Sequence, residues 1–217
     1  KAKYILKPGG TLGVLYTNSD LVYNDDGYIE VDKNGNVAVK DDYMDDIYLG
    51  SVFPKYNLAW RNDFNYKGIN LGVLFTARIG GICYSATQAN MDLYGVSEAS
   101  AAARDAGGVM INGRDMIDAQ KWYQVIGSQS GLPQYYTYSA TNVRLQELSL
   151  GYTLPSKWFR DKMRMTVSFV GRNLWMIYCK APFDPEAVAS TGMNYQGIDY
   201  FMMPSMRNLG FNVKFQF

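Results

Sequence analysis

The sequence has no histidine, only two cysteines and no surplus of charge of either sign: 21 Lys and Arg stand against 20 Asp and Glu among 217 residues. Without histidine, neither Cys83 nor Cys179 has the usual general base, so the sequence does not indicate catalysis by a thiol nucleophile. The near-neutral charge gives no electrostatic basis for binding nucleic acid. We expect two thiols rather than a disulfide, because the two cysteines fall on segments predicted not to be adjacent.

Long hydrophobic runs are also missing. No stretch of about 18 apolar residues occurs, which excludes a transmembrane helix but not transmembrane strands, whose alternating side chains keep the mean hydropathy low. The mean hydropathy is −0.21. The chain starts at Lys1 without a signal peptide, so we interpret it as a fragment of an exported protein whose export signal lies upstream.

Aromatic residues are abundant, with 18 Tyr, 10 Phe and 4 Trp, a composition typical of β-structure with polar loops. Apolar and polar residues alternate with a period of two in several segments, which predicts two-faced strands. The predicted strands are five: 56–64, 69–79, 142–154, 163–172 and 209–217.

The third strand changes phase along its length. Val143 and Leu145 have the opposite parity from Leu148, Leu150 and Tyr152. Either a β-bulge lies near Gln146 and Glu147, or the first half of the strand emerges from the apolar zone. The sequence leaves both explanations open.

The connections between these strands alternate in length. Asn65–Gly68 and Pro155–Lys162 are short, whereas the loops predicted at 81–140 and 175–205 are long. Outer-membrane barrels have short periplasmic turns and long extracellular loops, whereas a soluble β-sandwich has no reason for this asymmetry. The pattern therefore favours a membrane barrel.

The chain divides by this reading into an extracellular loop at 1–52 and the C-terminal strands of a barrel at 53–217. A hairpin is predicted in the first part, where 28–31 and 37–40 flank Asn34 and Gly35, a pair that favours a type I′ turn. Within the loop at 81–140, Ser97 is predicted to cap a short helix that ends before Gly107.

Ordered motifs along the chain resemble the C-terminal region of the SusC/RagA family of TonB-linked outer-membrane proteins. The motifs follow one another in the family's order: GSVFPKYN (50–57), YKGINL (66–71), NVRLQELSLGYTLP (142–155), GRNL (171–174), DPE (184–186), GIDY (197–200) and GFNVKFQF (210–217). Each motif alone is weak, but their order across nearly the whole chain makes the resemblance specific.

The resemblance implies an all-β fold: an antiparallel transmembrane β-barrel of the plugged class with about 22 strands, of which this chain supplies the last five. It implies a multi-pass protein of the cell outer membrane that imports oligosaccharides or peptides together with a SusD-like surface lipoprotein. TonB would act through the missing N-terminal part. Two other hypotheses remain: an outer-membrane adhesin or passive pore, and a soluble β-rich binding module.

Aromatic side chains in the predicted loops are the candidate contacts for substrate or partner, because amphipathic rings stack on sugars and peptide side chains. They could equally pack the loops. These candidates are Trp122, Tyr123, Tyr135, Tyr136, Tyr138, Tyr195, Tyr200 and Phe201. The resemblance also implies that the alternating C-terminal residues form a signal for the barrel-assembly machinery, namely Phe211, Val213, Phe215 and Phe217.

No catalytic, cofactor or metal site is predicted. Asp184 and Glu186 flank Pro185 in an extended loop without a nucleophile, so a loop anchor or turn is the better interpretation. Asp32, Asn34 and Asn36 have the start of a calcium-loop spacing but lack its Gly and its closing Glu. Four basic residues on the polar faces of the strands are predicted to line a passage or to pair with plug carboxylates: Arg61, Arg78, Arg172 and Lys214.

Overall fold

The structure is a computed structural model that describes residues 2–41, 46–128, 130–189, 192 and 195–217. The chain forms two compact units, which are described separately. The sheet unit comprises residues 54–80, 139–187 and 203–217. The mixed unit comprises residues 1–53, 81–138 and 188–202, so each unit is assembled from three pieces of the chain.

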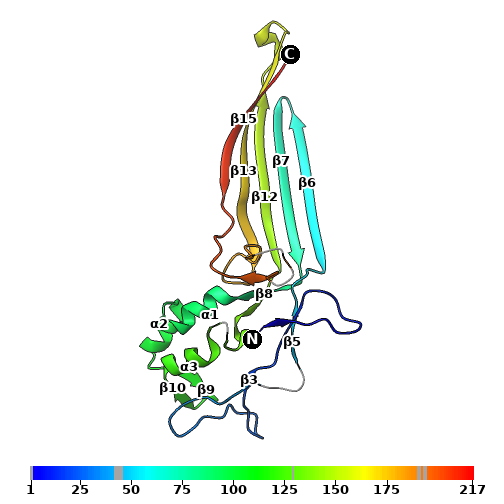
Figure 1. Ribbon diagram of the computed structural model, residues 1–217. Coiled ribbons are helices and arrows are strands. Elements are labelled where there is room, and N and C mark those ends of the chain that lie inside the picture. The colour runs from blue at the N-terminus through cyan, green and yellow to red at the C-terminus, as the bar shows by residue number, and fades with distance from the viewer. Residues whose placement is uncertain (1, 42–45, 129, 190–191, 193–194) are drawn as a thin grey trace. The chain divides into compact units, whose positions relative to one another are not determined.

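The sheet unit is one antiparallel sheet of five long strands that lie side by side in the order β15-β13-β12-β7-β6 (Figure 1). All five predicted strands are confirmed, with some bounds changed. The strands are β6 (Tyr56–Tyr66), β7 (Ile69–Ile79), β12 (Asn142–Thr153), β13 (Arg164–Cys179) and β15 (Asn208–Gln216).

The two short connections are present, the first tighter than predicted and the second longer by one residue at each end. Strands β6 and β7 are joined by Lys67 and Gly68 alone, with φ of 47° and 86°. Positive φ at both central residues is the requirement of a type I′ hairpin turn, which matches the right-handed twist of its strands. The connection between β12 and β13 contains the short 3-10 helix η2 (Ser156–Phe159).

Strand β13 is longer than predicted. We expected a loop from Trp175, but the strand continues to Cys179, where it still pairs with Asn142 of β12. Irregular pairing around Asn173, which has a φ of 52°, interrupts the period of two. The expectation was wrong because the irregular pairing interrupts the alternation of apolar and polar residues before the last residues of the strand.

The mixed unit consists of short elements. Its helices group beside the β9–β10 hairpin (Figure 1). The helices are α1 (Ala86–Leu93), α2 (Glu98–Asp105), α3 (Ala119–Ile126) and the 3-10 helix η1 (Pro133–Tyr136). Its strands are β1 (Lys3–Tyr4), β2 (Val14–Thr17), β3 (Asp20–Leu21), β4 (Val39–Lys40), β5 (Ile47–Ser51), β8 (Ile82–Ser85), β9 (Val109–Ile111), β10 (Asp115–Ile117), β11 (Thr137–Ser139) and β14 (Ile198–Asp199).

Each α-helix begins at a side-chain cap. Ser85, Ser97 and Asp118 each accept a hydrogen bond from the backbone N–H three residues ahead, which satisfies one donor that the first helical turn leaves open. The predicted cap at Ser97 is confirmed. No helix among the described residues combines the length and the apolar character needed to cross a membrane.

The predicted hairpin in the first fifty residues is present, but its turn is not type I′. Val31 bridges Val37, and the N–H of Gly35 donates to the carbonyl of Asp32 at 3.0 Å. Of the pair Asn34 and Gly35, Gly35 has positive φ and Asn34 does not. A longer loop forms because the Asp32 carboxylate accepts the N–H groups of Asn34 and Asn36.

The mixed unit has its own apolar core. Leu15 and Leu21 are fully buried, and they pack in one cluster with side chains from the helices, including Ile126. Among the described residues, every buried apolar side chain except Ala140, Ala181 and Pro185 lies in this unit. The region that we expected to be a long loop at 81–140 therefore contributes, in its described part, to a packed core.

Candidate functional site

One face of the five-stranded sheet is apolar across all five strands, apart from Asn62, which pairs with Val73. Along β6 and β7 the paired residues include Leu58 with Ala77, Trp60 with Phe75, and Phe64 with Leu71. The rings of Trp60 and Phe75 stack at a centroid distance of 5.7 Å. The opposite edge continues the face with Phe169 and Phe211, whose rings meet edge to face at 5.5 Å.

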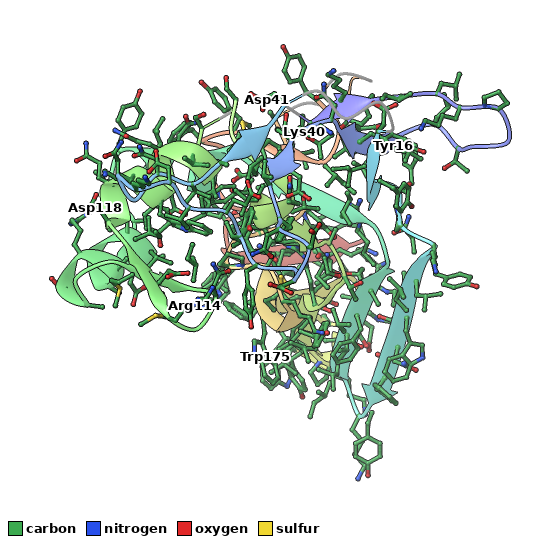
Figure 2. All side chains as sticks on the ribbon, turned by 90° about the horizontal axis from the view of Figure 1, so that it is seen from below. Tyr16, Lys40, Asp41, Arg114, Asp118 and Trp175 are labelled. Atoms are coloured by element: carbon green, nitrogen blue, oxygen red, sulfur yellow. The ribbon has the colours of Figure 1, made fainter. Side chains whose placement is uncertain are left out.

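This apolar face is exposed. Trp60 is 64% exposed and Phe211 81%, and side chains project from the ribbon of the sheet on both sides (Figure 2). Soluble monomers rarely expose one contiguous apolar patch larger than a few hundred Å². A face built from five strands in this way requires an apolar partner.

The phase change in β12 is a β-bulge. Leu145 pairs with Phe75 and Glu147 with Leu74, so Gln146 is the extra residue between them. The extra residue restores Val143 and Leu145 to the same apolar face as Leu148. The bulge explanation is confirmed, and the apolar zone covers the whole of β12.

The polar face carries a charge-balanced network. The Glu147 carboxylate accepts from Arg61 at 3.4 Å and from Arg172 at 3.1 Å, while Arg61 also donates to Asp63 at 2.9 Å. Two of the basic residues expected to face a passage or a plug therefore pair with carboxylates of their own sheet. Glycine at position 72 permits the network, since a Cβ there would meet Ser149 and lie 2.9 Å from Asp63 Oδ1.

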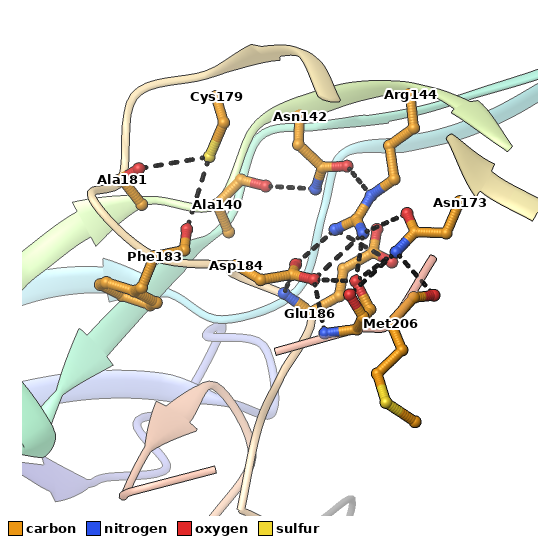
Figure 3. Close-up of polar contacts among 11 residues, drawn as sticks. Ala140, Asn142, Arg144, Asn173, Cys179, Ala181, Phe183, Asp184, Glu186 and Met206 are labelled. Atoms are coloured by element: carbon orange, nitrogen blue, oxygen red, sulfur yellow. Dashed lines mark hydrogen bonds and ion pairs between the residues drawn. The ribbon is translucent and has the colours of Figure 1, made fainter. Parts of the chain in front are cut away.

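A second polar cluster surrounds Arg144, whose side chain is only 2% exposed (Figure 3). Its Nη2 lies 2.5 Å from Asp184 Oδ1 and its Nη1 lies 3.2 Å from Asp184 Oδ2, a bidentate ion pair. Nε donates to Asn142 at 2.9 Å, and Nη1 donates to the Ser205 hydroxyl at 3.2 Å. Glu186 Oε2 lies 3.4 Å from Nη2.

Asp184 is the acidic centre of this cluster, which we call the Arg144 anchor: Asn142, Arg144, Asn173, Asp184, Glu186 and Ser205. Its carboxylate also contacts the Ser205 hydroxyl and accepts the N–H of Glu186 at 3.0 Å. Burial acts to raise the pKa of Asp184, but the hydrogen bonds from Arg144 and Ser205 outweigh burial and lower the pKa to about 2.

The sequence reasoning placed Asp184 and Glu186 in a loop anchor, which the structure confirms, but it missed Arg144. The available signal was one arginine between the apolar residues Val143 and Leu145, on a strand whose opposite face is apolar. Its partner lies 40 positions away, and sequence spacing does not reveal such pairs.

The predicted contact aromatics fall into two groups in the mixed unit. Trp122 and Tyr136 are 7% and 2% exposed and belong to the apolar core, so the packing interpretation describes these two. Tyr123 packs against that core, and Tyr138 is half-buried. Burial raises the pKa of Tyr136, with the Asp92 carboxylate as a second cause, which keeps its hydroxyl neutral.

The other predicted rings are accessible. Tyr195, Tyr200 and Phe201 are 59%, 47% and 59% exposed, and Tyr135 is 38% exposed while its ring meets Trp122 edge to face. Tyr200 and Phe201 pack against each other at 5.2 Å. A contact role for these four rings stays a prediction.

The residues of the predicted assembly signal all lie at the end of the chain and are exposed. Phe211, Val213 and Phe215 pair with the apolar positions of β13, and Phe217 follows the strand at 99% exposed. Their recognition by assembly machinery stays a prediction.

The remaining candidate features carry no metal or redox site within the described residues. Cys83 and Cys179 are thiols in different units, as expected. The Asp32 carboxylate accepts three hydrogen bonds from Asn34 and Asn36, which also lower its pKa. Among the residues described, no group of three or more metal-ligating side chains occurs.

The chain was compared with protein families and with curated proteins. No family model matches the chain. The chain is 25% identical over 198 residues to the TonB-dependent receptor P3 of Formosa agariphila, a match that covers 87% of this chain and 19% of that receptor. The chain therefore spans about a fifth of the length of the curated relative that it matches.

Two solved structures have a similar fold. The structure of the RagAB peptide transporter matches with a TM-score of 0.53 and 16% identity, over 95% of this chain and 23% of that chain. The RagAB peptide importer in its open-open state matches with a TM-score of 0.55 and 14% identity, over 94% of this chain and 23% of that chain. At such low identity the similarity shows the fold, and it agrees with the resemblance read from the sequence motifs.

Proposed function

Because this chain resembles the C-terminal portion of SusC/RagA-type TonB-linked outer-membrane proteins, we propose that it forms the last five strands of a plugged outer-membrane β-barrel that imports nutrients. The observation that carries the proposal is the exposed apolar face over β6, β7, β12, β13 and β15. Each strand has at least 9 residues, and about 9–11 residues of tilted strand cross the hydrocarbon core.

The sheet has two edges that support barrel closure by further strands. Strand β6 pairs only with β7, and β15 only with β13, among the described strands. In lipid each unpaired backbone N–H or C=O costs several kcal/mol, so strands that cross a membrane close into barrels. The alternation of short and long connections continues across this sheet, as it does in outer-membrane barrels.

The transport activity rests on the relatives. By the sequence resemblance, the whole protein would take up an oligosaccharide or a peptide presented by a SusD-like surface lipoprotein, with energy supplied through TonB. RagAB, which has a similar fold, is a peptide transporter, also described as a peptide importer. The exposed rings Tyr135, Tyr195, Tyr200 and Phe201 are the proposed contacts on this chain, because aromatic faces bind both sugars and peptide side chains.

The decisive experiment uses the full-length protein in its own cells. Uptake of labelled oligosaccharides and labelled peptides is compared between cells with the native protein and cells whose copy lacks the plug. Active import predicts that uptake of one class is saturable, requires energy and is lost with the plug. Unchanged uptake of every solute without the plug would contradict active import, and energy-independent uptake would indicate a passive pore.

The proposed assembly signal has a separate test. Phe217→Ser replaces the fully exposed final ring of the apolar series by a small polar group. We expect less folded barrel in the outer membrane, measured by heat-dependent migration in detergent gels. Normal assembly of the variant would show that Phe217 is not read as a signal.

A further inference from the structure

The segment between β13 and β15 is held at its base by the Arg144 anchor. It leaves the sheet unit after Ala187 and re-enters it at Met203. Asp184 lies just before the exit and Ser205 just after the return, and both bind the guanidinium group of Arg144. One buried side chain of β12 thus binds residues on both sides of segment 188–202, the part of this connection that belongs to the mixed unit.

Every nitrogen of the Arg144 guanidinium group contacts a partner in the anchor. Arginine presents five N–H donors in a planar fork. Here they meet Asn142 on β12, both carboxylate oxygens of Asp184, Ser205 and Glu186. A lysine has three donors and no planar fork, so it could hold only part of this set.

Ser205, at the C-terminal end of the segment, is also bound by a residue of β13. Asn173 of β13 donates from its amide to the Ser205 hydroxyl at 2.8 Å and to the Ser205 carbonyl at 3.1 Å. The positive φ of Asn173 marks a local break in β13. The irregularity that interrupts the strand therefore coincides with a residue that binds the segment, as expected for a bulge at a functional position.

Segment 188–202 contains three of the four exposed rings proposed as contacts, Tyr195, Tyr200 and Phe201. It has hydrogen bonds of its own within the mixed unit, where Ser85 donates to Asp199 at 2.7 Å and Phe201 N–H donates to Thr87 at 2.6 Å. Fixing the ends of a loop lowers the entropy that the loop still has to lose when it binds a ligand.

We propose that Arg144 is a positioning residue for uptake: by closing the base of segment 180–207, it holds the rings of that segment ready for the transported oligosaccharide or peptide. This proposal rests on the import function proposed above. The side chain of Arg144 is 2% exposed and is therefore out of reach of a solute. Its effect passes through Asp184 and Ser205 to the segment that carries the rings.

The test compares Arg144→Lys and Arg144→Met in the full-length protein, with all rates divided by the amount of assembled protein. A positioning role predicts that the half-saturating solute concentration rises about tenfold in Arg144→Met, which corresponds to about 1.4 kcal/mol. Arg144→Lys should lie between Arg144→Met and the native protein. The maximal rate per assembled molecule should not change, which separates positioning from a general loss of folded protein.

Hydrogen exchange supplies a second measurement that does not depend on transport. We expect amides in 188–202 to exchange faster in Arg144→Met, with exchange in β12 and β13 unchanged away from the substitution. The matched control is Arg164→Met, which removes an exposed arginine from the other end of β13. It should behave as the native protein in both measurements.

The outcomes separate this inference from the import function. If the native protein imports a solute but Arg144→Met leaves both the half-saturating concentration and the exchange unchanged, the positioning role is wrong. If the native protein imports nothing, the ligand part of the inference fails together with the proposed function, and exchange alone decides whether Arg144 holds the segment. If Arg144→Met does not assemble, Asp184→Asn serves the same test, since it keeps the side-chain shape and removes the charge.

Discussion

The two units of this chain place their apolar side chains in opposite ways. The mixed unit buries its apolar residues in a core, as a protein in water does. In the sheet unit the two largest fully buried side chains are polar, Arg144 and Asn142, while rings such as Trp60 and Phe211 are exposed. One chain therefore contains a part built for water and a part whose apolar face requires lipid or another apolar partner.

This difference explains why composition alone is uninformative here. A 47% hydrophobic content would suit an ordinary soluble domain. What distinguishes the sheet unit is the arrangement of apolar residues with a period of two over five strands, on a face whose rings are exposed.

The largest effect is expected from Trp122→Ala in the mixed unit. Trp122 is 7% exposed within the core, and truncation of a buried Trp costs about 3–5 kcal/mol. Hydrogen exchange should accelerate across 81–138 while the five long strands remain protected. Unchanged protection together with weaker solute binding would instead make Trp122 a contact residue.

The next effect compares neighbours on β12 that face opposite sides of the sheet. Leu150 is 53% exposed on the apolar face, and Ser149 lies on the polar face beside Gly72. Lysine facing lipid near the bilayer midplane costs about 2–4 kcal/mol. Leu150→Lys should therefore reduce the folded protein recovered from the outer membrane, and Ser149→Lys should not. If a soluble surface is correct, both variants will fold equally well.

A smaller effect concerns pH and Asp184. Its pKa in the folded protein is about 2, against an ordinary 3.8. A lowered pKa means that the stabilisation is present above pH 4 and is lost as the pH falls from about 4 to 2, by about 2 kcal/mol in total.

Pepsin cleavage of segment 180–207 measures this loss. At pH 4 the native protein should be cleaved more slowly than Asp184→Asn, which lacks the charge, and at pH 2 the two rates should converge. A constant ratio of the two rates over this range would show that the Asp184 charge does not hold the segment.

The smallest effect is expected at the β6–β7 turn. Lys67 has a φ of 47°, a conformation that asparagine adopts more readily than lysine. Lys67→Asn should stabilise the sheet by less than about 1 kcal/mol, and Lys67→Val should destabilise it because a branched Cβ is strained there. The midpoint of the heat-dependent shift in detergent gels measures both changes, and equal midpoints would argue against a type I′ turn.

The sequence predicted the sheet unit well and the mixed unit poorly, for a physical reason. Long strands with one apolar face produce a regular alternation, and every second residue of β7 from Ile69 to Ile79 is apolar. The alternation failed where the backbone is irregular, at Gln146 and Asn173. The short elements of the mixed unit bury residues that are far apart in sequence, such as Leu15 and Ile126, and no local pattern reports that contact.

The aromatic residues predicted to contact substrate also could not be sorted from the sequence into buried and exposed ones. Amphipathic rings in loops look alike in a sequence, yet Trp122 and Tyr136 pack the core while Tyr195, Tyr200 and Phe201 are exposed. The anchor was half predicted, because the Asp184–Glu186 motif is visible in the sequence. Its basic partner on β12 could be identified only once the strand and the loop were placed together.

The central claim is that the apolar face of the sheet contacts lipid, and spin labels along β7 test it most directly. Single cysteines are introduced at Leu71, Val73 and Phe75, and on the other face at Asn70 and Thr76, in full-length protein that lacks Cys83 and Cys179 and is reconstituted in bilayers. We expect collisions with oxygen, which concentrates in lipid, at the first three positions, and relatively greater access of a water-soluble nickel complex at the other two. Oxygen access that does not alternate along β7, or that is low on both faces as in a covered β-sandwich, would contradict the account.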